Sequence, residues 1–251
     1  MGWLGLPLAK HFISHGYKIK ASSRSKSRLH ELRALKIEPS ILDIGALPDD
    51  LAGFLQSNIL IINIPSKDIE GFFSLIKKIE NSEIKKILFV SSTSVYTDQN
   101  KTIFESDSAD AISNPLVTIE NLFRENRHFK TTIVRFGGLI GYSRNPGKFF
   151  HKGNLVKNPD AYVNLIHRDD CIHIISRIVK QEAWGEIFNA CADTHPTKRE
   201  FYTQAAKNIG LSAPQFAESD MLSFKIISNQ KVKQTLNYEF LHPDLMKIKF
   251  D

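Results

Sequence analysis

The chain has 251 residues, of which 42% are hydrophobic and 24% charged. This is the composition of an ordinary globular protein with a sizeable core, and it excludes disordered, fibrous and disulfide-stapled classes. Lys and Arg number 33 against 27 Asp and Glu, a formal net charge of +6. The basic residues are dispersed and lack the interleaved aromatic residues of a base-stacking surface, so we expect small anionic ligands rather than nucleic acid.

The two cysteines, Cys171 and Cys191, have neither CxxC spacing nor neighbouring histidines. We interpret them as reduced, buried thiols, and we expect no metal site. The longest apolar run, residues 59–64, is far shorter than the roughly 20 residues of a membrane span. With no signal-peptide pattern at the first residues, the expected location is the cytoplasm and no membrane partner is expected. The oligomeric state is left open.

Helical and strand patterns alternate through the first half of the chain. A helix with Pro7 in its first turn is predicted to end before Gly16. Apolar runs predict buried parallel strands, and apolar residues at helical spacing predict the helices between them. The expected strands are 17–21, 39–43, 58–64, 86–91 and 131–135, and the expected further helices are 27–35, 69–79 and 115–124.

The pattern is looser after Gly141. Strands are expected at 162–166 and 186–190, and helices at 169–179 and 198–209. The tail carries a segment at 223–228 and a short polar helix near Lys231, and residues 246–250 alternate like a strand but are charged on one face. Glycine, proline and asparagine cluster between residues 141 and 160. We therefore predict a nucleotide-binding domain over 1–141 and a smaller substrate-side portion, interleaved with it, over 142–251. The fold class is α/β, a Rossmann-like doubly wound parallel sheet with helices on both faces.

Gly2 and Gly5 have the spacing of the second and third glycines of the dinucleotide-binding turn G-x-G-x-x-G. There the second glycine lets the backbone approach the pyrophosphate, and the third lets helix and strand pack closely. A helix that simply begins with two glycines is the alternative. The helix, strand and polar turn that follow favour the dinucleotide site.

The residues of that polar turn indicate the cofactor. NAD-binding units usually place an acidic residue there, which holds the ribose 2′-hydroxyl. This chain has Ser22, Ser23, Arg24, Ser25 and Lys26 instead. A guanidinium with serine hydroxyls can bind a 2′-phosphate, so we favour NADP over NAD. An ordinary solvated basic turn is the alternative.

Several motifs in a fixed order carry a resemblance to a known family. They are residues 2–9 (GWLGLPLA), 91–96 (SSTSVY), 135–141 (RFGGLIG), 145–150 (NPGKFF), 163–167 (VNLIH), 187–190 (IFNA), 210–216 (GLSAPQF) and 242–244 (HPD). With these the sequence resembles the extended short-chain dehydrogenase/reductase superfamily, and within it the atypical YeeZ-like group of NAD(P)-dependent epimerase/dehydratase proteins.

The resemblance implies roles for particular residues. For the phosphates of the cofactor, it implies that the pyrophosphate turn is formed by Gly2, Trp3, Leu4 and Gly5, and that the 2′-phosphate is bound by Ser23 and Arg24. It further implies that Asp43 contacts the adenine and that Ser91 lies near the nicotinamide ribose. The strand end at Ile64 and Pro65 is implied to lie beside the cofactor. For the substrate, it implies that the Ser92 hydroxyl meets a carbonyl or alcohol and that Asn164 and His167 begin the substrate pocket.

One departure from the superfamily bears on the chemistry. Catalytic members carry Tyr-x-x-x-Lys, in which the tyrosine is the general acid/base and the lysine lowers its pKa. The corresponding stretch here, residues 111–120 (AISNPLVTIE), holds neither residue. The atypical group shares this loss, so the usual reaction cannot simply be carried over.

Other residues are candidates for the missing acid/base or for substrate binding, each with a structural alternative. Tyr96 could act as an acid/base or pack at the strand exit. His167 titrates near neutrality in an ordinary setting or is a structural histidine. Arg135 could pair with a substrate phosphate or only end its strand. Ser92 could bind substrate or cap the strand exit.

Two functions remain in competition. The first is an NADP-dependent epimerase/dehydratase or oxidoreductase with a non-standard acid/base, acting on a nucleotide sugar or a related carbonyl or alcohol. The second is a catalytically inactive NADP-binding sensor or scaffold. The missing Tyr and Lys favour the second, whereas the glycine turn and Ser92 are compatible with the first.

The sequence starts within the glycine turn, at the residue between its first and second glycines. The first, central strand of the Rossmann order 3-2-1-4-5-6 is therefore expected to be missing. An empty central position leaves two strand edges unpaired. We expect the natural protein to be longer by about 8–12 residues, the usual strand length plus one turn.

Overall fold

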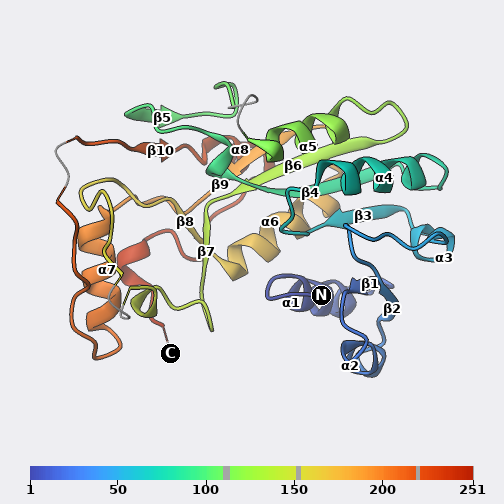
Figure 1. Ribbon diagram of the computed structural model, residues 1–251, viewed down its shortest axis with the longest axis horizontal. Coiled ribbons are helices and arrows are strands. Elements are labelled where there is room, and N and C mark those ends of the chain that lie inside the picture. Colours follow the sequence, from blue (N-terminus) through green and yellow to red (C-terminus); the bar gives the residue numbers. More distant parts are fainter. Residues whose placement is uncertain (110–113, 151–153, 219–220, 251) are drawn as a thin grey trace. The chain divides into compact units, whose positions relative to one another are not determined.

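A computed structural model describes residues 1–109, 114–150, 154–218 and 221–250 (Figure 1). The chain forms two compact units from interleaved segments. The first unit comprises Met1–Ser91, Ala111–Val134 and Ile175–Ile187, and the second comprises Ser92–Asp110, Arg135–Ile174 and Phe188–Asp251. The predicted domain boundary at 141–142 stays a prediction.

The first unit alternates strands with helices, as expected for an α/β fold (Figure 1). Its elements are α1 (Gly5–Ser14), β1 (Lys20–Ser23), α2 (Arg28–Ala34), β2 (Glu38–Ile41), α3 (Ala52–Leu55), β3 (Ile59–Ile62), α4 (Ile69–Glu80), β4 (Lys86–Ser92), α5 (Pro115–Arg124), β6 (Lys130–Phe136), the second half of α6 (Arg168–Lys180) and the start of β9 (Ile187–Ala190). Within the described residues, no helix combines the length and the apolar character that a membrane crossing requires.

Among the described residues, the strands named above form two sheets. β1 and β2 pair in parallel, with Lys20 opposite Glu38. The other strands form a four-stranded sheet in the order β3-β4-β6-β9, in which β3 and β4 are parallel, with Ile59 opposite Lys86. β3 was predicted to be buried on both faces, but three of its four residues are half-buried, because β3 lies at the edge of its sheet.

Local signals define the helices that cover this sheet. α4 begins where the Asp68 side chain accepts a hydrogen bond from the Gly71 N–H at 2.9 Å. α5 begins at Asn114, whose side chain accepts from the Leu116 N–H at 3.1 Å, and it has Pro at its first turn. The two helices lie side by side (Figure 1). Both bury an apolar face against the sheet, and this is the core of the first unit.

The second unit has shorter elements. They are the 3-10 helix η1 (Thr93–Val95), β5 (Lys101–Ile103), β7 (Gly138–Ile140), the 3-10 helix η2 (Pro146–Lys148), β8 (Leu165–His167), the first turns of α6, α7 (Lys198–Lys207), β10 (Lys225–Ile227), α8 (Gln230–Leu236) and the 3-10 helix η3 (Leu245–Lys247). β5 pairs in parallel with β10, and β7 pairs in parallel with β8. α7 begins with a capping box in which Thr197 and Glu200 satisfy each other's N–H groups.

The predicted elements agree best with the structure where a cap or an apolar run defines them. The helix predicted at 115–124 is α5, and the helix predicted at 198–209 is α7. The alternating pattern at 246–250 does not form a strand: the structure has η3 over Leu245–Lys247, because the Asp244 side chain accepts from the Met246 N–H at 3.0 Å and starts a helical turn. α3, β5 and β7 were not predicted, since none exceeds four residues. Residues 111–113 and 151–153 of the stretches discussed above lie outside the described residues.

Both cysteines are buried with no exposed side-chain surface, as predicted. Burial raises the pKa of the Cys171 and Cys191 thiols far above the ordinary value. The Cys191 thiol donates a hydrogen bond to the Ile227 carbonyl at 3.1 Å. These thiols are therefore held in the unreactive, protonated form.

Candidate functional site

The glycine turn leads directly into α1. The Leu6 N–H donates to the Gly2 carbonyl at 3.1 Å, and the helix follows from Gly5. A Cβ placed on Gly2 would meet nothing within 4 Å, whereas one on Gly5 would lie 3.2 Å from Met1 Sδ. No side chain caps the helix, and its first turn holds no acidic residue. The N-terminus of α1 can thus accept an anion, with open space at Gly2 and close packing at Gly5.

Two arginines lie close to this turn. The Arg28 Nη1 donates to the Met1 carbonyl at 2.7 Å. The charges of Arg28 and Arg24 both act at Met1. Arg24 is exposed, and beside it Ser23 is 5% exposed with its Oγ accepting from the Ser25 N–H at 3.2 Å. Arg28 was missed from the sequence, although it follows Arg24 at the spacing of one helical turn.

Three further predicted cofactor residues lie just beyond the ends of two strands of the first unit. Asp43 is exposed two residues beyond β2, and its carboxylate accepts from the Gly45 N–H at 3.3 Å. β3 ends at Ile62, so Ile64 and Pro65 follow the strand rather than end it as predicted.

Ser91 has a partner that sequence reasoning missed. The Ser91 hydroxyl donates to the Glu120 carboxylate at 2.5 Å, and Glu120 has no exposed surface. Glu120 lies on α5, the helix on which the Tyr-x-x-x-Lys pair was looked for. A signal for it existed, because Glu120 falls three residues from both Val117 and Phe123, on the apolar face of the helix. A fully buried carboxylate is rare unless it is paired.

In the second unit, Ser92 acts as a cap. Its Oγ accepts a hydrogen bond from the Ser94 N–H at 3.1 Å and so starts η1. The residue is half-buried. The hydroxyl proton is not used in this bond, so Ser92 can cap and still donate to a ligand.

Tyr96 and Arg135 form a buried pair. Tyr96 is 2% and Arg135 3% exposed. Arg135 Nη1 donates to the Tyr96 hydroxyl at 2.6 Å, and the hydroxyl donates to Asn189 Oδ1 at 3.0 Å. Burial is the largest cause that raises the Tyr96 pKa, although Arg135 opposes it. These contacts favour the structural alternative for both residues.

Asn164 uses both ends of its amide inside the second unit. Its Nδ2 donates to the Lys225 carbonyl at 2.9 Å, and its Oδ1 accepts from the Ile227 N–H at 2.8 Å. The side chain thereby bonds to the main chain of β10. The predicted role of Asn164 in a substrate pocket stays a prediction beside this structural one.

His167 lies in a cluster with Asp169 and His242. Its Nδ1 is 3.5 Å from Asp169 Oδ2, and its ring centroid is 3.8 Å from that of His242. His242 Nε2 is 3.8 Å from the same carboxylate oxygen. Burial and the nearby His242 lower the pKa of His167 to about 4. At neutral pH this imidazole is therefore uncharged, and its Nδ1 accepts a hydrogen bond from the Asp169 main-chain N–H at 3.3 Å.

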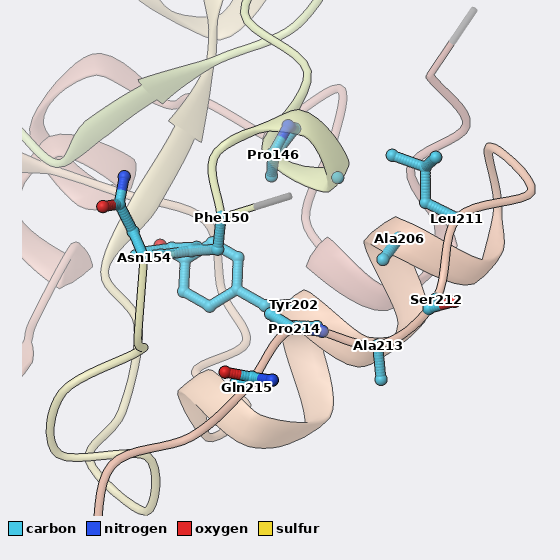
Figure 2. A pocket seen from close by; sticks show the side chains of 11 residues that line it. Pro146, Phe150, Asn154, Tyr202, Ala206, Leu211, Ser212, Ala213, Pro214 and Gln215 are labelled. Carbon is cyan, nitrogen blue, oxygen red and sulfur yellow. The ribbon is translucent and has the colours of Figure 1, made fainter. Parts of the chain in front are cut away.

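The second unit also contains a pocket of about 290 Å³ (Figure 2). Residues of η2, α7 and the segment after α7 enclose it. Its lining side chains are Pro146, Phe150, Asn154, Tyr202, Ala206, Leu211, Ser212, Ala213, Pro214 and Gln215, with the backbone of Gly147. The Phe150 and Tyr202 rings meet edge to face, with centroids 4.8 Å apart. None of these described lining residues was among the predicted site residues.

Comparison with known proteins places the chain in a family. It is 30% identical over 260 residues to Protein YeeZ of Escherichia coli K12, an alignment that spans 97% of this chain and 94% of YeeZ. No family model matches the chain. A UDP-glucuronic acid 4-epimerase of Bacillus cereus, solved with NAD and a UDP-sugar analogue, superposes with a TM-score of 0.79 at 17% identity, covering 98% of this chain and 93% of the epimerase. A human epimerase family protein, solved with NADPH, superposes with a TM-score of 0.63 at 11% identity, covering 92% and 97% of the two chains.

The parallel strands, the intervening helices and these superpositions define a Rossmann-like α/β protein with the fold of the epimerase/dehydratase group, which confirms the predicted fold class. By its likeness to YeeZ over nearly the whole of both chains, the chain belongs to the YeeZ family. The resemblance inferred from the short motifs is thereby confirmed.

Proposed function

We propose that the first unit binds NADP and that the protein acts on a nucleotide sugar or a related carbonyl or alcohol compound. The observation that carries the proposal is the turn from Gly2 to Gly5. It offers main-chain N–H groups and open space at a helix N-terminus, with the guanidinium groups of Arg24 and Arg28 close to Met1. The ligands of the two superposed structures, NAD with a UDP-sugar analogue and NADPH, support the same class.

The residues present fit a dinucleotide. The turn at Gly2–Gly5 would hold the pyrophosphate, since a helix N-terminus without an acidic residue attracts anions. Ser23 and Arg24 would hold the 2′-phosphate. Asp43, Ile64, Pro65 and Ser91 would line the remainder, and the Glu120 carboxylate would fix the Ser91 hydroxyl. The bound nicotinamide would supply hydride transfer.

The choice of NADP over NAD is tested at Arg24. Replacing Arg24 by alanine removes an exposed guanidinium, and charge-assisted hydrogen bonds contribute about 1.5–3 kcal/mol each. We therefore expect Arg24→Ala to weaken NADPH binding by about ten- to hundredfold and to leave NADH binding unchanged. Titration calorimetry or quenching of tryptophan fluorescence measures both dissociation constants.

Lys26→Ala is the matched control for Arg24→Ala. Lys26 is exposed in the same turn. Its removal therefore lowers the long-range attraction for the phosphate by a similar amount, but it removes no specific hydrogen bond to the 2′-phosphate. Wild-type protein that binds NADH as tightly as NADPH would contradict the assignment. An equal loss in the two variants would reduce the role of Arg24 to general electrostatic attraction.

Turnover is tested at Ser92. The Ser92 hydroxyl can donate to a substrate oxygen while its lone pair caps η1. With NADP(H) and a panel of sugar nucleotides and simple carbonyl compounds, we expect measurable hydride exchange, and we expect Ser92→Ala to lower the rate by about 10²-fold, the effect of losing one oxyanion donor. Ser94→Ala is the control, because Ser94 is exposed and not assigned to the site. An unchanged rate in Ser92→Ala would remove Ser92 from the mechanism.

A sensor or scaffold that binds NADP without turnover is the second candidate. Its support is that α5, from Pro115 to Arg124, carries neither Tyr nor Lys, while Tyr96 is enclosed in a buried pair with Arg135. NADPH binding that depends on Arg24, together with no hydride exchange against the whole panel, would favour this function over catalysis.

A further inference from the structure

His167, Asp169 and His242 come from three places in the second unit. His167 ends β8, Asp169 lies in the first turn of α6, and His242 follows α8. Each offers one possible ligand atom, and these three atoms lie within 4.8 Å of one another. His167 has 8% of its side chain exposed, whereas Asp169 and His242 have 30% and 32% exposed. An ion from solution could therefore reach the cluster.

The candidate ligand atoms lie near one another without bonding one another, although the Asp169 main-chain N–H donates to His167 Nδ1 at 3.3 Å and would have to give way to an ion there. The distances to Asp169 Oδ2 are 3.5 Å from His167 Nδ1 and 3.8 Å from His242 Nε2, beyond the roughly 2.7–3.2 Å of an N–H···O bond. Tetrahedral Zn²⁺ with bonds of about 2.0–2.1 Å separates its ligands by about 3.3 Å. An ion bound by all three atoms would need to draw the two imidazoles a few tenths of an ångström closer to Asp169 Oδ2, and to draw the remaining pair together by up to about 1.5 Å.

The surrounding residues fix the ligands in place. A Cβ on Gly141 would lie 2.4 Å from His167 Nε2, so this backbone confines one edge of the ring and directs Nδ1 toward Asp169. The fully buried Asp170 accepts from the Leu241 N–H at 2.7 Å and from the His242 N–H at 3.2 Å. It therefore holds the segment that carries His242. Such supporting contacts orient metal ligands in proteins.

Two neighbours bear on the charge of the cluster. The Tyr142 hydroxyl donates to the Asp169 oxygens at 3.0 and 3.1 Å, and it would supply a fourth oxygen or give way to water. The Arg168 guanidinium lies 3.7 Å from the centre of the Tyr142 ring. The positive charge of Arg168 repels a bound cation and so limits the affinity of the cluster for metal ions. This favours a metal ion that binds nitrogen ligands strongly.

We propose that His167, Asp169 and His242 form a binding site for a divalent transition-metal ion of the Zn²⁺ type. Two imidazoles and one carboxylate suit Zn²⁺, Co²⁺ or Ni²⁺, whereas Mg²⁺ and Ca²⁺ prefer oxygen ligands throughout. The inference goes beyond the proposed NADP chemistry and does not depend on it. It opposes the sequence-based expectation that the protein has no metal site.

The test is metal binding by the full chain after treatment with a chelator. Co²⁺ titration followed by its visible absorption, with displacement by Zn²⁺, should give one tight equivalent in wild type. We expect His242→Ala and Asp169→Asn each to weaken this binding by at least about tenfold. Zn²⁺ should also raise the Tm of wild type and not that of the variants. Asp169→Asn keeps the shape of a half-exposed side chain, so it tests the site even if His242→Ala misfolds.

His15→Ala is the control variant. The half-buried His11 lies in the last turn of α1 and the exposed His15 is its C-cap, with ring centroids 4.3 Å apart, and such a pair can chelate metal weakly. We expect His15→Ala to keep the tight equivalent. The proposal is overturned if the wild-type protein binds neither Co²⁺ nor Zn²⁺, or if both cluster variants bind as tightly as the wild type. It is also overturned if the His15→Ala variant no longer binds Co²⁺.

Discussion

Phe72→Ala is expected to lower the free energy of unfolding by about 3–5 kcal/mol, the cost of removing a fully buried phenylalanine. Phe72 has no exposed surface. Its ring meets those of Phe89 and Phe123 edge to face, with centroids 5.8 and 6.0 Å away. Its removal leaves a cavity between α4, α5 and β4 that these rigid neighbours cannot fill. Urea unfolding followed by tryptophan fluorescence measures the loss, since Trp3 and Trp184 both belong to the first unit.

Phe73→Ala provides the internal comparison on the same helix. Phe73 is 45% exposed and its ring lies 5.3 Å from Lys77 Nζ. We expect a loss within about 0.5 kcal/mol, the usual range for surface changes. Equal losses for the two neighbouring phenylalanines would mean that the face of α4 that packs on the sheet has been assigned wrongly.

Asp170→Ala is expected to destabilise the second unit by about 3 kcal/mol. The Asp170 carboxylate accepts from the Tyr238 hydroxyl at 2.7 Å and from the Leu241 and His242 N–H groups. Each donor left buried without an acceptor costs about 1–3 kcal/mol. Burial, the largest cause, raises the pKa of the Asp170 carboxyl despite these bonds, so relief of this burial offsets part of the loss. Thermal unfolding by circular dichroism measures the effect.

Tyr238→Phe separates the contributions to this cluster. It removes one of the three donors, and because the main-chain bonds remain, we expect a loss of about 1 kcal/mol. A loss in Asp170→Ala no larger than that in Tyr238→Phe would show that the main-chain bonds to Leu241 and His242 contribute nothing to stability.

The parts of the fold that could be predicted from the sequence are those set by neighbouring residues. Asn114 and Pro115 mark the start of α5, and the run of apolar residues from Ile59 marks β3. The turn from Gly2 to Gly5 that leads into α1 could be predicted for the same reason, because a few consecutive residues form it. The alternating pattern of residues 246–250 does not lead to a strand, since the Asp244 side chain caps η3 instead.

The candidate site was less predictable because tertiary contacts create it. Nothing near Ser91 in the sequence indicates that Glu120 is its partner, although Ser91 Oγ lies 2.5 Å from Glu120 Oε1. His167 was considered alone, because His242 is distant along the chain and only the folding of the second unit places their rings together. The hydrogen bonds of the buried Tyr96 hydroxyl with Arg135 and Asn189 likewise form only in the folded protein. Spacing can indicate that a polar residue such as Glu120 is buried, but it does not indicate which side chain will be its partner.

The interleaving of the two units has a consequence for biosynthesis. The first unit includes Ile175–Ile187 and the second extends to the end of the described chain. A ribosome must therefore release most of the polypeptide before either unit has all its segments. The first unit therefore stays incomplete until residues 175–187 emerge, and incompletely folded chains that expose apolar surface depend on chaperones. Mutations that delay the docking of residues 175–187 would thus lower the yield of folded protein even where they change its equilibrium stability little.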